Sequence, residues 1–244
     1  MKSLNISKNS TIAIIGIRSG SKGLIDKNIK LLNGKPLIYW IVKTALNTPE
    51  INRVIVSTDS EKYAEIAKSC GAEVPFLRPA EISGDTSTDV EYVNHCLAYL
   101  KDVEKITPRV ALRLMATVPL QKSQDLSKII HNCLNNNVDS SVIVTEAKQN
   151  PKKALKIIKT ENGEKRLVSY ETETGVGVSP TLRQDHDKAY FRANAIAFNP
   201  RVVSTTGTLT GNIVIPHIIS NDEFIDIDSK ADFEFAEFLM MKND

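Results

Sequence analysis

The sequence predicts an α/β fold with an open, mostly parallel sheet that carries helices on both faces. Short apolar runs rich in isoleucine and valine alternate with segments of helical pattern over the first two-thirds of the 244 residues. Residues 11–17 (TIAIIGI) have the continuous apolar character of a strand that is buried on both faces of a sheet. Repeated strand–helix units joined by short loops are typical of parallel sheets.

Each predicted element follows from its local pattern. Residues 36–47 predict a helix, because Pro36 suits a first helical position and Asn47 suits the end. Residues 61–69 predict a second helix, which Gly71 stops. The same reasoning predicts extended segments at 53–57, 73–76, 109–115, 138–145 and 190–198, and helices at 89–101, 126–135 and 230–241.

The pattern changes after residue 150. Residues 150–183 are polar, contain three glycines and have weak periodicity, which indicates an excursion from the main sheet built of hairpins. We therefore expect a single domain over residues 1–244, with an insertion at about 150–190.

Composition and charge exclude several classes of protein. Hydrophobic residues make up 41% and charged residues 25%, as in soluble globular proteins. A net charge of +2 gives no electrostatic reason to expect a nucleic-acid partner. Since the sequence has no run of 18 apolar residues and the first ten residues are polar, we expect no membrane span and no signal peptide. Cys70, Cys96 and Cys133 form no CxxC pair, and we expect buried, reduced thiols in a cytoplasmic protein.

The segment between the first strand and the first helix is unusually long. Residues 18–35 (RSGSKGLIDKNIKLLNGK) occupy a position where two to six residues are usual. They follow the carboxyl end of a strand, where open α/β sheets bind ligands. Three glycines let backbone amides approach an anion, and five cationic side chains neutralise its charge, which predicts a polyphosphate site. The alternative is a solvated loop; neither GxGxxG nor the Walker pattern is present.

This segment carries a resemblance to a known family. RSGSKGLIDKN resembles the R-x-G-S-K-G-x-x-x-K-N signature of the acylneuraminate cytidylyltransferases, the CMP-sialic acid synthetases. The resemblance spans about residues 11–240. Further segments that follow in the family's order are VIVSTD at 54–59, GAEVPFLRPAE at 71–81, Asp85-Thr86, Arg183-Gln184, Arg192-Ala-Asn194 and IDID at 225–228.

The resemblance implies one nucleotidyltransferase domain of the nucleotide-diphospho-sugar transferase type. It implies transfer of CMP from CTP to the anomeric hydroxyl of an acidic nine-carbon sugar, with pyrophosphate released, and a homodimer that uses the insertion for its contacts. The residues implied to bind CTP are Arg18, Ser21, Lys22, Lys27, Asn28 and Arg78. Those implied to bind the sugar are Lys153, Arg183, Arg192, Asn194, Met115 and Thr117. Those implied to be catalytic are Arg18, Lys27 and Asp228. The alternative for Arg78 is that it only pins its own loop.

Asp226 and Asp228 are the predicted ligands of Mg²⁺. In an extended stretch, residues two apart face the same side, so Ile225 and Ile227 would face the core and both carboxylates the site. Carboxylate oxygens, with triphosphate oxygens and waters, suit Mg²⁺. The alternative for this segment is helix capping, which we adopt for Asp232; the resemblance favours the metal for the other two.

The chain departs from the family pattern where the sugar is expected. The family's L-L-Q-P-T-S-P-L-R corresponds to residues 113–121, where Met115 replaces the amide, Val118 the serine and Gln121 the arginine. Gly16 stands where the family has proline. Lost polar groups change which hydroxyls a pocket can hold, so the acceptor could be a related acid such as legionaminic or pseudaminic acid. The alternatives are a nucleotidyltransferase for another acidic sugar or a phosphonate, and a catalytically silent nucleotide-binding homologue.

Overall fold

The computed structural model describes residues 10–20, 24–134, 137–171 and 187–243. The chain divides into two compact units, residues 1–144 together with 192–244, and residues 145–191. Among the described residues, no helix is both long and apolar enough to cross a membrane.

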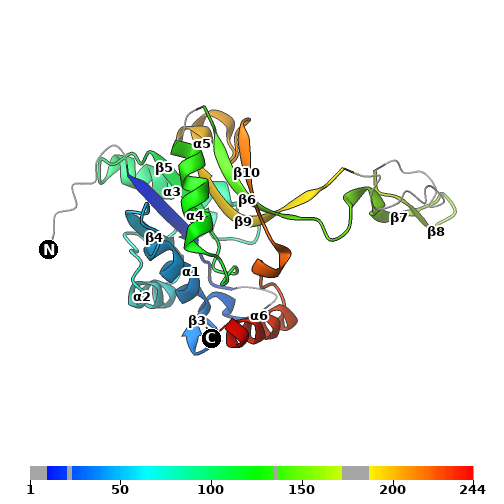
Figure 1. The fold of residues 1–244 in the computed structure, drawn as a ribbon, viewed down its shortest axis with the longest axis horizontal. Coiled ribbons are helices and arrows are strands. Elements are labelled where there is room, and N and C mark those ends of the chain that lie inside the picture. The colour runs from blue at the N-terminus through cyan, green and yellow to red at the C-terminus, as the bar shows by residue number, and fades with distance from the viewer. Residues whose placement is uncertain (1–9, 21–23, 135–136, 172–186, 244) are drawn as a thin grey trace. The chain divides into compact units, whose positions relative to one another are not determined.

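An open, mostly parallel sheet of six strands forms the centre of the first unit (Figure 1). Its strands, in spatial order, are β10 (Val214–Ile219), β6 (Ser140–Glu146), β9 (Tyr190–Phe198), β5 (Val110–Leu114), β1 (Thr11–Gly16) and β4 (Arg53–Ser57). Strand β1 pairs in parallel with β4 on one side and with β5 on the other, whereas β9 runs antiparallel to β5. The chain order reverses between β1 and β5, and such a switch point is where open α/β sheets bind ligands.

Helices cover both faces of this sheet, as predicted. One face is covered by α1 (Leu37–Leu46), α2 (Glu61–Ser69) and α4 (Ser123–Leu134), and the other by α3 (Asp89–Asp102) and α5 (Arg201–Thr206). Along β1, Ala13 and Ile15 belong to the first core cluster, while Ile12 and Ile14 belong to the second, and all four are fully buried. This alternation confirms the prediction of a strand buried on both faces.

A third cluster attaches the C-terminal helix α6 (Lys230–Asn243) to a small hairpin of β2 (Leu31–Leu32) and β3 (Lys35–Pro36). Because Pro36 pairs with Leu31 in this hairpin, it caps α1 instead of occupying the first helical position that the sequence predicted. The extended segment predicted at 73–76 contributes a parallel bridge between Glu73 and Ile55.

The long segment after β1 is partly structured, which the sequence did not predict. It contains the hairpin and a 3-10 helix, Lys27–Ile29. Asp26, in front of this helix, has a φ of 54°. Its carboxylate accepts hydrogen bonds from the Tyr63 hydroxyl at 2.9 Å and from Lys62 Nζ at 3.0 Å. These bonds anchor the segment to α2 and fix where Lys27 begins.

Gly16 ends β1 against the ring of Tyr92 from α3, and a Cβ at position 16 would overlap that ring. We therefore expect Gly16→Ala to lower the free energy of unfolding by about 1–3 kcal/mol, as overpacking does. Urea unfolding measures this change. Gly84→Ala is the matched control, because its Cβ would meet only Ser87 Oγ, at 3.8 Å. Equal stability of the two variants would contradict the close packing of Gly16 on Tyr92.

The second unit contains a hairpin, as the glycine-containing excursion predicted. Strands β7 (Leu155–Lys159) and β8 (Lys165–Ser169) pair antiparallel. The 3-10 helix Pro151–Lys153 precedes them and begins with a hydrogen bond from Lys152 N to Asn150 Oδ1.

The three cysteines are free thiols. Cys96 is buried as expected, but Cys70 and Cys133 are half-buried, so the expectation of full burial is wrong for these two. Burial nevertheless raises the pKa of Cys96 and of Cys133 to about 12.

Candidate active site

A cavity of about 410 Å³ lies at the carboxyl ends of β1 and β5. The sequence-predicted residues that line it are Arg18, Lys27, Asn28, Arg78, Met115, Thr117 and Asp228. The other lining residues are Gly16, Ser87, Asp89, Tyr92 and Ala116. Residues from the first loop, from the segment after β5 and from the C-terminal segment thus meet at the switch point of the sheet.

Arg78 is a buried cation at this cavity. Its Nε donates to Ser57 Oγ at 3.1 Å, its Nη2 donates to the Ser57 carbonyl at 2.5 Å, and its guanidinium lies 4.6 Å from the centre of the Tyr92 ring. Burial lowers the pKa of Arg78. Arg78 therefore pins its loop to β4 and also lines the cavity, so its structural role leaves its predicted role in binding CTP open to test.

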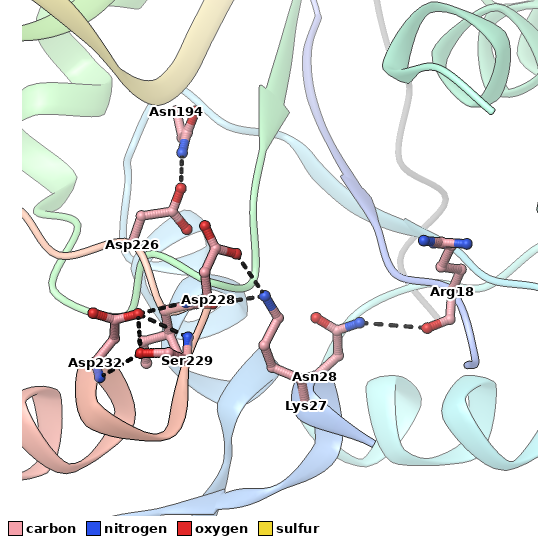
Figure 2. Close-up of polar contacts among 9 residues, drawn as sticks. Arg18, Lys27, Asn28, Asn194, Asp226, Asp228, Ser229 and Asp232 are labelled. Carbon is pink, nitrogen blue, oxygen red and sulfur yellow. Dashed lines mark hydrogen bonds and ion pairs between the residues drawn. The ribbon is translucent and has the colours of Figure 1, made fainter. Parts of the chain in front are cut away.

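Lys27 connects the first loop to the C-terminal segment (Figure 2). Its Nζ donates to the Ile227 carbonyl at 2.7 Å and to Asp228 Oδ1 at 3.0 Å. The side chain of Lys27 is only 14% exposed, whereas that of Asp228 is 79% exposed. The cation is therefore held in place while the carboxylate remains open to solvent.

Asp226 lies beside this pair. Ile225 and Ile227 are buried, which confirms that the two isoleucines face the core. Asp226 Oδ2 accepts a hydrogen bond from Asn194 Nδ2, as Figure 2 shows. Burial raises the pKa of Asp226, and the neighbouring charge of Asp228 adds to this effect.

The second oxygen of Asp226, Oδ1, is buried and has no hydrogen-bond partner among the described residues. The Thr117 hydroxyl lies close enough to lower the pKa of this carboxyl, although its geometry falls short of a hydrogen bond. A buried acceptor without a donor is costly unless a ligand satisfies it.

The carboxylates of Asp226 and Asp228 fit a hard cation that is bound mainly by ligands from outside the protein. Within the described part of the chain, no group of three or more histidine, cysteine or acidic side chains is placed so that it could hold a metal ion by itself. Asp226 and Asp228 offer carboxylate oxygens alone, which suits Mg²⁺ when phosphates and waters complete its shell. Asp232 serves the capping role adopted for it, since its Oδ2 accepts hydrogen bonds from Ser229 N at 2.7 Å and from Asp228 N at 3.1 Å.

Arg18 and Asn28 also line the cavity. Arg18 Nη1 lies 2.6 Å from Asp85 Oδ1, and Asn28 Nδ2 donates to the Arg18 carbonyl at 3.4 Å. Asp59 holds the next residue, because its carboxylate accepts from Ser19 N at 2.8 Å and Ser19 Oγ at 2.6 Å. Burial would raise the pKa of Asp59, but these hydrogen bonds outweigh it and lower the pKa.

Several predicted residues are not brought together at this cavity. Ser21, Lys22 and Arg183 lie outside the described residues. Arg192 is exposed near the start of β9 and is not among the described residues that line the cavity. Lys153 belongs to the second unit, where it lines a separate cavity of about 320 Å³ formed by residues of that unit.

The three residues that depart from the family pattern, Met115, Val118 and Gln121, do not all lie at the cavity. Met115 lines the cavity. Val118 and Gln121 are buried and are not among the described lining residues. Of the three departures, Met115 is therefore the one that lies at the cavity, where it places a thioether in the position of the family's amide.

Sequence reasoning missed Asp89 and Tyr92 at the cavity, and Asp59 and Arg113 next to it. Asp59 ends the segment VIVSTD, for which the family resemblance implies no role. Arg113 does carry a signal in the sequence, because it is a charged residue inside an otherwise apolar strand.

Comparison with known proteins agrees with this geometry. Residues 12–217 match a family model described as cytidylyltransferase. The chain is 28% identical over 236 residues to the pseudaminic acid cytidylyltransferase of Campylobacter jejuni subsp. jejuni serotype O:2, with 95% of this chain and 97% of that protein covered. It is 26% identical over 242 residues to the N-acylneuraminate cytidylyltransferase of Escherichia coli O18:K1:H7, covering 96% of this chain but 53% of that protein, so it spans about half the length of that relative.

Solved structures show the same fold. A CMP:2-keto-3-deoxy-manno-octonic acid synthetase complexed with CTP superposes with a TM-score of 0.69 at 13% identity, over 96% of this chain and 100% of that one. The 4-diphosphocytidyl-2C-methyl-D-erythritol synthase of Anaerococcus prevotii superposes with a TM-score of 0.63 at 15% identity, over 97% and 98%. With the fold established and most of its length matched by the family model, the chain belongs to the cytidylyltransferase family.

Proposed function

We propose that this protein transfers CMP from CTP to the anomeric hydroxyl of a nine-carbon ulosonic acid and releases pyrophosphate. The observation that carries the proposal is the meeting of Arg18, Lys27 and Arg78 with the carboxylate of Asp228 at the cavity. Asp226 lies two residues before Asp228 in the same segment and is not among the described lining residues. Nucleotidyl transfer depends mainly on positioning and charge neutralisation, which this arrangement can supply.

In this reaction the acceptor oxygen forms a bond to the α-phosphorus while the bond to the β-phosphate bridging oxygen breaks. Lys27 is positioned by two hydrogen bonds, so its cation can stabilise charge that develops on the phosphate without first reorganising. Arg18 lies at the same cavity and can pair with phosphate oxygens once it exchanges Asp85 for them. Arg78 and the Tyr92 ring offer a flat, polar-edged surface that suits a pyrimidine base.

The proposal includes Mg²⁺, held by Asp226 and Asp228 together with phosphate oxygens of CTP. The bound ion would withdraw charge from the phosphate oxygens and so favour attack at phosphorus. Asp226 is suited to this role because its Oδ1 is buried without a hydrogen-bond donor among the described residues. Asp228 is suited because its carboxylate is exposed at the cavity.

We infer that the acceptor is a relative of N-acetylneuraminate, of the legionaminic or pseudaminic type. Met115 supports this inference, since a thioether at the cavity cannot bind sugar hydroxyls as an amide does. The end-to-end match with a pseudaminic acid cytidylyltransferase supports it independently.

We also propose a homodimer that forms through the second unit, residues 145–191. Its hairpin exposes the apolar side chains of Leu155, Ile157 and Leu167, and Tyr170 beside it is exposed as well. Exposed apolar clusters of this kind mark interaction surfaces. Light scattering over a range of concentrations tests the proposal, and a monomer at every concentration would contradict it.

The experiment that tests the function is a pyrophosphate-release assay with CTP, Mg²⁺ and a panel of nine-carbon ulosonic acids. Release with a legionaminic- or pseudaminic-type acid is the expected result. Release only with N-acetylneuraminate would overturn the proposed acceptor but not the reaction class. Measurable CTP binding without release for any acid would favour the catalytically silent homologue.

A further inference from the structure

Arg113 is a buried cation in the middle of the central sheet. It lies on β5, where all the other residues are apolar, and its side chain is 7% exposed. A buried guanidinium is costly unless its charge and its donors are matched. Arg113 is not among the described residues that line the cavity, so a direct contact with substrate does not account for it.

Its partners lie on two different elements of the fold. Nε of Arg113 lies 3.1 Å from Asp89 Oδ2, at the start of α3. Nη1 donates a hydrogen bond to the carbonyl oxygen of Asn194 at 3.0 Å, on the neighbouring strand β9. One guanidinium thus joins a residue that lines the cavity to a residue that holds Asp226.

Asn194 is the only non-glycine residue with a positive φ in the described β-strands, at 58°. Such a conformation is unusual in a strand, persists only when its surroundings impose it, and is found mostly at functional sites. The hydrogen bond from Arg113 holds the carbonyl of this residue, and its side-chain amide donates to Asp226 Oδ2 (Figure 2). The other carboxylate oxygen, Oδ1, is buried and has no hydrogen-bond partner among the described residues.

We propose that Arg113 is a positioning residue, which fixes Asn194 so that Asp226 presents its Oδ1 to the cation and the triphosphate. The inference rests on the proposed function, because it assigns Asp226 the role of a metal ligand. Removal of a residue that hydrogen-bonds to a metal ligand typically lowers metal affinity or activity by about 10–100-fold.

The test compares Arg113→Met with Arg53→Met. Arg53 is the matched control. It lies in the same sheet, its side chain is also 7% exposed, and it also has two partners, the carboxylates of Glu73 and Glu104. The measurement is Mn²⁺ affinity by electron paramagnetic resonance, in the presence of an α,β-methylene analogue of CTP that cannot turn over. We expect Arg113→Met to weaken Mn²⁺ binding about 10–100-fold. Arg53→Met should lower thermal stability but leave Mn²⁺ affinity within about twofold, because its partners lie away from Asp226.

A second pair of variants keeps the test decisive if Arg113→Met does not fold. Arg113→Lys preserves the charge and one donor, and should recover part of the Mn²⁺ affinity. Asn194→Gly tolerates the positive φ but removes the amide, so it should weaken Mn²⁺ binding as much as the loss of Arg113 does, with little further loss when both are changed.

Wild-type Mn²⁺ affinity in Arg113→Met would overturn the positioning role. Wild-type affinity in the double variant Arg113→Lys, Asn194→Gly would do the same. Either result would leave Arg113 as part of a purely structural ion pair. Failure of the proposed function gives a different result. In that case the wild-type protein itself binds no Mn²⁺ with the analogue and releases no pyrophosphate.

Discussion

Replacing Lys27 with methionine should slow pyrophosphate release by about 10²- to 10³-fold, the cost of removing one preorganised group that stabilises transition-state charge. Two hydrogen bonds, to the Ile227 carbonyl and to Asp228 Oδ1, hold the ammonium at the edge of the cavity. Methionine preserves the length and apolar stem of the side chain but removes the charge. Steady-state kinetics with saturating CTP and Mg²⁺ measure the effect, which should appear in kcat.

Lys30→Met is the matched control for this variant. Lys30 lies in the same segment and is exposed, with its ammonium 5.6 Å from the centre of the Phe233 ring. The charge change is identical, so a general electrostatic effect would alter both variants alike. We expect kcat of Lys30→Met to stay within about twofold of wild type. Equal losses in both variants would contradict a specific role for Lys27.

Asp226→Asn and Asp228→Asn should each abolish most of the turnover, by about 10³-fold. The expected size follows because a bound metal contributes several kcal/mol of charge stabilisation, and each 1.36 kcal/mol is a factor of ten in rate. Asparagine keeps the shape of each side chain but removes the charge that a cation needs. The Mg²⁺ concentration for half-maximal rate should rise in both variants, and a titration of rate against Mg²⁺ measures it.

Asp232→Asn is the control for the carboxylate variants. Asp232 lies next to the same segment but caps α6 through Ser229. The asparagine oxygen can still accept these hydrogen bonds, so the variant should lose less than about 1 kcal/mol of stability and leave the Mg²⁺ dependence unchanged. Near-normal turnover in Asp226→Asn or Asp228→Asn would refute the metal role of that carboxylate.

Much of the fold could be predicted because its elements carry strong local patterns. Strand β4 and helix α2 have the predicted boundaries, since an apolar run and an amphipathic stretch mark each of them clearly. The two-residue strands β2 and β3 are too short to have a period. Strand β10 was missed because Pro216 interrupts an edge strand whose side chains are mostly exposed.

The candidate site also contains residues that the sequence could predict and residues that it could not. Lys27, Asn28 and the carboxylates of Asp226 and Asp228 stand in short motifs, so the sequence alone could single them out. The pairing of Arg113 with Asp89 and Asn194 joins three separate elements. No local pattern encodes such a pairing, because it depends on how the strands are ordered in the sheet.

Transfer of the CMP group is tested most directly by ³¹P nuclear magnetic resonance of CTP incubated with the protein, Mg²⁺ and a legionaminic- or pseudaminic-type acid. The expected result is loss of the three CTP signals, with a pyrophosphate signal and a new phosphodiester signal growing in equal molar amounts. Unchanged CTP signals with every acid tested, in a protein that binds CTP and Mg²⁺, would contradict the proposed cytidylyl transfer.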